Sequence, residues 1–154
     1  MKRLVIGYGN PLRQDDGFGW RVAERLQAAP CHQDVVVLCC HQLTPELAEP
    51  ISRCEQVIFV DTRVGKPQGM LEWQQVSCPM DEAVGMTHFT TPQALLALAE
   101  HLYGSAPKKA HLLTVRSTHL QHGEDLSPEV AQAVEEAVVQ IQRMLTETPQ
   151  DDRA

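Results

Sequence analysis

Short apolar segments alternate with amphipathic segments along this chain, and the alternation strongly limits its possible folds. The runs at residues 4–6, 35–40, 57–61 and 112–115 are almost entirely apolar, as expected for strands covered on both faces of a sheet. Residues 71–75 instead alternate apolar and polar side chains, which predicts a more exposed edge strand. The chain is therefore expected to form five strands.

Four amphipathic helices are predicted between and after these strands. The first has Phe18, Val22 and Leu26 on one face and ends by Pro30. The other three are expected to begin where a hydroxyl residue precedes proline, a favoured helix start, at Thr44-Pro45, Thr91-Pro92 and Ser127-Pro128. This order of elements predicts an α/β fold with three layers, a mostly parallel twisted five-stranded sheet with helices on both faces.

Composition narrows the class of protein further. The length of 154 residues predicts one α/β domain over residues 1–148, followed by a polar, disordered tail at 149–154. A net charge of −7 argues against nucleic acid or an anionic membrane as the main partner. Because no apolar run approaches the ~20 residues of a membrane span and the N-terminal run is too short for a signal peptide, we expect a cytoplasmic protein.

Chemistry in a parallel sheet is expected outside the carboxyl ends of the strands. The first strand is followed by a glycine-rich loop, residues 7–19, but this loop does not match a dinucleotide-binding motif because Leu12 stands where the third glycine is needed. Two adjacent carboxylates, Asp15 and Asp16, would also repel phosphate. One interpretation is that they cap the following helix, and another is that one of them binds a ligand; the two are compatible.

Two further residues are candidates at the same edge. Asp61 directly follows an apolar strand, and a buried unpaired charge costs several kcal/mol, so Asp61 must be solvated, paired or bound to a metal. His88 lies in the loop before a predicted helix, where a surface role is the usual one. Together with Asp16, these side chains form a mixed oxygen and nitrogen set that suits zinc or nickel better than calcium or magnesium. Their spacing does not show that they converge.

Residues 7–19, GYGNPLRQDDGFG, resemble the signature loop of the hydrogenase maturation endopeptidases, which trim a C-terminal extension from the large subunit of nickel–iron hydrogenases. Residues 41–47 and 57–61, and Thr87-His88 followed by Pro92, are similar to further segments of that family in the same order. The resemblance implies that Asp16, Asp61 and His88 are the nickel-binding and catalytic residues. Some relatives have Glu at the position of Asp16, and the shorter side chain would place the metal closer to this loop.

The resemblance also implies the function and the partner. The chain would be a hydrolase, aspartic-type or metal-assisted, that acts as a monomer on a hydrogenase large-subunit precursor. The nickel would be supplied by that substrate, and another divalent ion can take its place in a crystal. The sequence has neither a D-T-G pair nor an H-E-x-x-H helix, and Asp16 or Asp15 is the candidate general base.

The sequence leaves two alternative functions open. One is a nickel checkpoint or chaperone that binds the precursor without cleaving it, and the other is a small-molecule hydrolase or nucleotide binder on the same architecture. Arg13, Arg63 and Arg116 are candidates for contacting the extension peptide. The cleavage site and the particular hydrogenase do not follow from the sequence.

Overall fold

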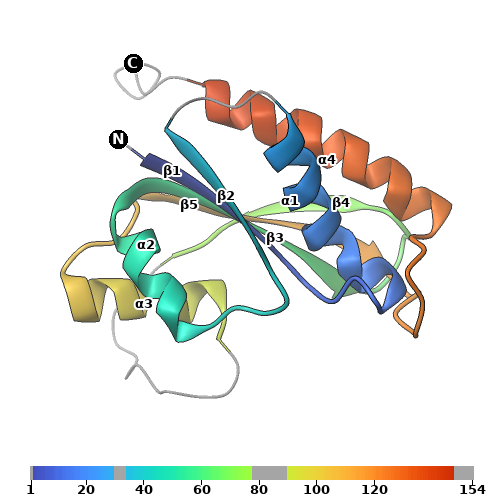
Figure 1. Ribbon diagram of the computed structural model, residues 1–154, viewed down its shortest axis with the longest axis horizontal. Coiled ribbons are helices and arrows are strands. Elements are labelled where there is room, and N and C mark those ends of the chain that lie inside the picture. The colour runs from blue at the N-terminus through green and yellow to red at the C-terminus, as the bar shows by residue number, and fades with distance from the viewer. Residues whose placement is uncertain (1, 30–33, 78–89, 148–154) are drawn as a thin grey trace.

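The protein folds around one five-stranded sheet, seen in a computed structural model that describes residues 2–29, 34–77 and 90–147 (Figure 1). The strand order is β2-β1-β3-β5-β4; β1, β2, β3 and β5 are parallel and β4 runs antiparallel to β5. The strands are β1 (Lys2–Tyr8), β2 (Val35–Cys40), β3 (Cys54–Val64), β4 (Leu71–Gln75) and β5 (Lys109–Ser117). The predicted fold class is therefore confirmed.

Helices cover both faces of this sheet. The α-helices are α1 (Phe18–Ala28), α2 (Ala48–Ser52), α3 (Pro92–Tyr103) and α4 (Pro128–Thr146). Two 3-10 turns, η1 (Gln14–Gly17) and η2 (Pro45–Leu47), precede α1 and α2. Helices α1 and α4 lie together on one face, and α2 and α3 lie on the other (Figure 1).

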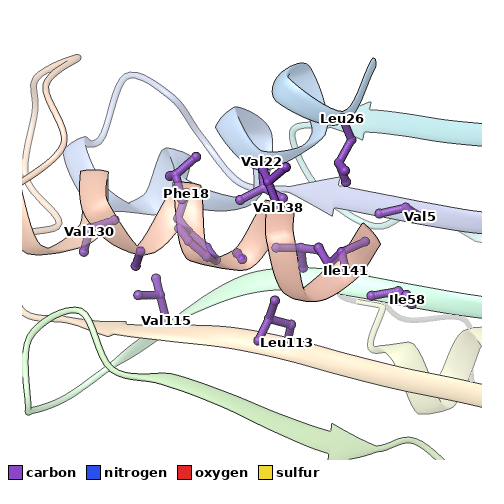
Figure 2. Packing of buried hydrophobic residues seen from close by; sticks show 14 of the residues in the cluster. Val5, Phe18, Val22, Leu26, Ile58, Leu113, Val115, Val130, Val138 and Ile141 are labelled. Atoms are coloured by element: carbon purple, nitrogen blue, oxygen red, sulfur yellow. The ribbon is translucent and has the colours of Figure 1, made fainter. Parts of the chain in front are cut away.

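Each face has its own hydrophobic core, because side chains alternate between the two faces along a strand. Figure 2 shows the core beneath α1 and α4, where helix residues such as Phe18 and Ile141 pack against Ile58 and Leu113 of the sheet. The core beneath α2 and α3 contains Phe59 and its neighbours instead. Beyond Val60, the same alternation directs Asp61 toward the α2–α3 face and Thr62 toward the α1–α4 face.

The structure differs from the sequence prediction mainly at the ends of elements. Strands β3 and β5 extend to Val64 and Ser117, because their polar last residues continue to pair with each other. The helix predicted after Thr44 consists of η2 and the five-residue α2, and Thr44 makes no side-chain capping bond. Thr91 and Ser127 do cap their helices, accepting hydrogen bonds from the backbone N–H groups of Ala94 and Val130.

Across the part of the chain that the structure describes, none of the helices combines the length and apolar character needed to cross a bilayer. The predicted tail, residues 149–154, and the loop with His88 lie outside the described residues.

Candidate functional site

The topology predicts a ligand site between β1 and β3. The chain passes from β1 outward to β2 and then returns to β3 on the other side of β1, so the connections that leave β1 and β3 diverge. In an open parallel sheet, such a reversal of strand order opens a crevice at the carboxyl ends of the two strands. Turn η1, which carries Asp16, follows β1, and Asp61 lies near the end of β3.

Asp61 is held in place by two hydrogen bonds. Its Oδ1 accepts the backbone N–H of Thr62 at 2.7 Å, and its carboxylate accepts the hydroxyl of Tyr8, the last residue of β1. Burial raises the pKa of the Asp61 carboxyl from 3.8 to about 6, and the nearby charge of Asp16 acts in the same direction. Burial, together with the charge of Asp61, also raises the pKa of the Tyr8 hydroxyl, which therefore stays protonated as a donor.

Asp16 lies in turn η1, near enough to Asp61 for its charge to raise the pKa of that carboxyl. Its Oδ2 accepts the backbone N–H of Asn10 at 2.9 Å, and among the described residues none donates a hydrogen bond to its Oδ1. The loop fits closely around this residue at Gly9, which has φ +145° and where an added Cβ would lie 2.0 Å from the backbone oxygen of Asp16. Two of the three predicted site residues therefore lie near each other at the predicted edge of the sheet, and their role as metal ligands remains a prediction.

Asp15, the neighbour of Asp16, has a different environment. It is completely buried, and its Oδ2 accepts hydrogen bonds from Ser117 Oγ, Gln68 Nε2 and Ser127 Oγ at 2.6, 2.7 and 2.9 Å. Its Oδ1 accepts the backbone N–H of Ser127 at 2.8 Å, at the start of α4. The Asp15 carboxylate therefore binds the first residues of α4, whereas neither aspartate makes a side-chain cap at α1. With both oxygens occupied and buried, Asp15 is poorly placed to act as a general base.

A second loop holds turn η1 from outside. Residues 118–123, which follow β5, accept the backbone N–H of Gln14 at Gly123 and the N–H of Asp15 at His119. Gln14 has φ +54°, an uncommon conformation for a residue with a side chain, and its Oε1 accepts the N–H of Gln121. Several long-range bonds therefore fix the conformation of the turn that presents Asp16.

The structure does not test the roles predicted for the other site residues. His88 lies outside the described residues, and within residues 2–29, 34–77 and 90–147 no group of three or more His, Cys, Asp or Glu could hold a metal ion. The three candidate arginines all bond to this chain: Arg13 donates to the Leu120 carbonyl, Arg63 to Gln74, and Arg116 to the Lys66 carbonyl and to Glu72. A role for them in peptide binding remains a prediction.

Sequence analysis missed two polar residues beside Asp61. Tyr8 continues the alternating pattern of Leu4 and Ile6 on the α2–α3 face, and its place at the carboxyl end of β1 was the available signal. Thr114 of β5 is the register partner of Asp61. Its hydroxyl is buried and has no hydrogen-bond partner among the residues that the structure describes. The row of side chains across β1, β3 and β5 is therefore polar at this edge.

These features define a doubly wound α/β protein with a carboxylate pair at its switch point. No model of a known protein family matches the chain, and no curated protein matches it. Solved structures do. The hydrogenase maturating endopeptidase HybD from E. coli superposes with a TM-score of 0.73 at 25% identity, over 94% of this chain and 92% of that chain.

Two archaeal structures give the same result. A hydrogenase 2 maturation peptidase from a Thaumarchaeota archaeon matches with a TM-score of 0.71 at 25% identity, over 95% of this chain and 99% of that chain. The nickel–iron hydrogenase maturation protease HycI from Thermococcus kodakarensis matches with a TM-score of 0.75 at 23% identity, over 95% and 93%. In its fold, the chain is similar to the hydrogenase maturation endopeptidases.

Proposed function

We propose that this chain is an endopeptidase that removes the C-terminal extension of a nickel–iron hydrogenase large-subunit precursor after nickel has been inserted. The observation that carries the proposal is the Asp16–Asp61 pair at the switch point of a fold shared with maturation proteases along almost the whole chain. Acting as a cytoplasmic monomer, the protein would expose this edge of its sheet to a large protein substrate.

The carboxylate pair supports recognition of a cation. Two like charges lie close together here, and burial already disfavours ionisation of Asp61. A divalent ion between the two side chains would offset both effects, and carboxylates with an imidazole from His88 match the ligand preferences of nickel or zinc. We infer that the nickel belongs to the substrate and that Asp16, Asp61 and His88 recognise it.

This recognition would place the scissile peptide close to the sheet edge. A metal ion can polarise a water molecule or the carbonyl of the scissile peptide bond. Holding these groups in a fixed arrangement is a large part of the catalytic effect in such sites. Of the two candidate bases, Asp16 is better placed than Asp15, because the Asp15 carboxylate is buried and accepts four hydrogen bonds. The Tyr8 hydroxyl and the Thr62 N–H would keep the Asp61 carboxylate oriented.

Mass spectrometry of the nickel-loaded precursor tests the proposal. Wild-type protein is expected to shorten the precursor at its C-terminus, and Asp16→Ala and His88→Ala are each expected to reduce the cleavage rate about 100-fold or more, beyond the typical cost of losing an outer partner of a metal ligand. Asp125→Ala and His122→Ala, at exposed positions after β5, are the matched controls and should cleave normally.

Two results would contradict it. Full activity of Asp16→Ala or His88→Ala would remove the metal-recognition role of these residues. A precursor that binds but keeps its original mass would instead identify a nickel checkpoint or chaperone without peptidase activity.

A further inference from the structure

Thr62 connects strand β3, which carries Asp61, to turn η1, which carries Asp16. Its backbone N–H donates to Asp61 Oδ1 at 2.7 Å, and its hydroxyl donates to the backbone carbonyl of Asp15 at 2.8 Å. These two hydrogen bonds of Thr62 therefore link the Asp61 carboxylate to turn η1, which carries Asp16. The second bond joins β3 to η1 through Thr62 and Asp15, which are 47 residues apart in sequence.

The Asp15 end of this path is fixed. Its buried carboxylate accepts four hydrogen bonds, from Gln68, Ser117 and, twice, Ser127, and its N–H donates to the His119 carbonyl at 3.0 Å. Moving Asp15 would break these bonds and leave buried polar groups unpaired, which costs free energy. The network therefore holds Asp15 in place. The Asp15 carbonyl is thus a rigid point from which the position of β3 can be set.

The side chain of Thr62 does not face the candidate site itself. Asp61 points toward the α2–α3 face of the sheet, and the next residue points toward the α1–α4 face, where the Asp15 carbonyl lies. The Thr62 hydroxyl therefore lies on the opposite side of β3 from the Asp61 carboxylate. It would act on that carboxylate through the backbone of β3 and through η1.

We propose that Thr62 is a positioning residue whose hydroxyl, bound to the anchored carbonyl of Asp15, sets the separation between the Asp16 and Asp61 carboxylates. The expected effect of Thr62 on catalysis rests on the proposed peptidase function. Its structural part, the coupling of β3 to η1, concerns the free protein. Groups that orient metal ligands from outside typically change metal affinity or activity about 10–100-fold when removed.

A pair of substitutions separates the hydroxyl from the rest of the side chain. Thr62→Val removes the hydroxyl but keeps the branched shape, whereas Thr62→Ser keeps the hydroxyl and removes the methyl group. With nickel-loaded precursor, Thr62→Val is expected to lower kcat about 10-fold with little change in KM, and Thr62→Ser is expected to stay close to wild type. Both proteins are assayed below the onset of their thermal unfolding.

Amide hydrogen exchange of the free proteins supplies the second readout. The amides of Asp15 and Asp16 donate to the carbonyls of His119 and Arg13, and they should exchange faster in Thr62→Val but not in Thr62→Ser. Wild-type exchange and wild-type kcat in Thr62→Val would overturn the proposal, as would equal losses in both variants. If the wild type does not cleave the precursor, the proposed function fails, and the exchange result alone decides the role of Thr62.

Discussion

The hydroxyl of Tyr8 donates a hydrogen bond to the carboxylate of Asp61 across the junction of β1 and β3. Tyr8 ends β1 and Asp61 lies within the neighbouring parallel strand β3, each one residue beyond the paired Gly7 and Val60. The contact keeps a partly buried carboxylate oriented at the crevice but does not offset the full cost of its burial, because the pKa of Asp61 is still raised to about 6.

This pKa predicts an unusual dependence of stability on pH for the metal-free protein. An aspartate whose pKa is higher in the folded than in the unfolded state binds its proton more tightly when folded. Asp61 therefore destabilises the protein most above about pH 6, and this cost disappears as the pH falls toward the ordinary pKa of 3.8. Urea unfolding in a chelator should show Asp61→Asn more stable than wild type at pH 8, by up to about 3 kcal/mol. If Asp61→Asn were more stable than wild type by the same amount at every pH, the raised pKa of Asp61 would be contradicted.

Substitution of the two adjacent aspartates should affect different properties, stability at Asp15 and activity at Asp16. Asp15→Asn puts an amide N–H among the donors of Gln68, Ser117 and Ser127, and is expected to lower the free energy of unfolding by about 3 kcal/mol. Asp16→Asn, at a half-buried position with one backbone donor, should unfold much as wild type does but lose precursor cleavage. Equal urea midpoints for the two variants would contradict the structural role of Asp15.

Gly9 and Gly65 offer a matched test of the close contact at the loop. Their φ values are nearly equal, +145° and +147°, but an added Cβ would lie 2.0 Å from the Asp16 backbone oxygen at Gly9, and would meet no described atom within 4 Å at Gly65. Gly65→Ala should cost only the backbone strain, about 1–3 kcal/mol. Gly9→Ala should cost clearly more, measured by thermal unfolding, and should also lower activity. A similar cost at both positions would mean that the contact is easily relieved.

The buried hydroxyl of Thr114 predicts a stabilising substitution. It has no hydrogen-bond partner among the described residues, and an unpaired buried hydroxyl costs about 1–3 kcal/mol. Thr114→Val keeps the shape of the side chain and is expected to raise the free energy of unfolding by about 1 kcal/mol, whereas Thr114→Ser, which keeps the hydroxyl, should show no gain. A loss of stability in Thr114→Val would show that the hydroxyl has a partner in solution.

The fold could be predicted because its signals are local. Apolar runs identified β1, β2, β3 and β5, and alternation identified β4. The hydroxyl–proline pairs at Thr91 and Ser127 marked two helix starts that their capping bonds confirm. The position of Asp61 at the carboxyl edge followed from the same reasoning. Periodicity could not give the ends of β3 and β5, because their last residues pair with each other but are mostly polar and continue no apolar run.

The environment of Asp15 could not be predicted from the sequence. Its side-chain partners Gln68, Ser117 and Ser127 are 53, 102 and 112 residues away, and no local pattern links such positions. The sequence therefore could not distinguish the roles of Asp15 and Asp16, and only the fold shows that their environments differ. The same limit applies to Thr62, whose hydrogen bond to Asp15 depends on how β3 and η1 meet in space.

The bond between Asp15 and the start of α4 has a consequence for how the protein is made. The turn that presents Asp16 is complete only when Ser127 has docked on it, so a nascent chain that ends within β5 lacks this support. Contacts between residues so distant in sequence form late, because closing the long loop must precede any gain from the contact. The crevice should thus mature among the last parts of the molecule, and a partly synthesised chain should be unable to act on its substrate.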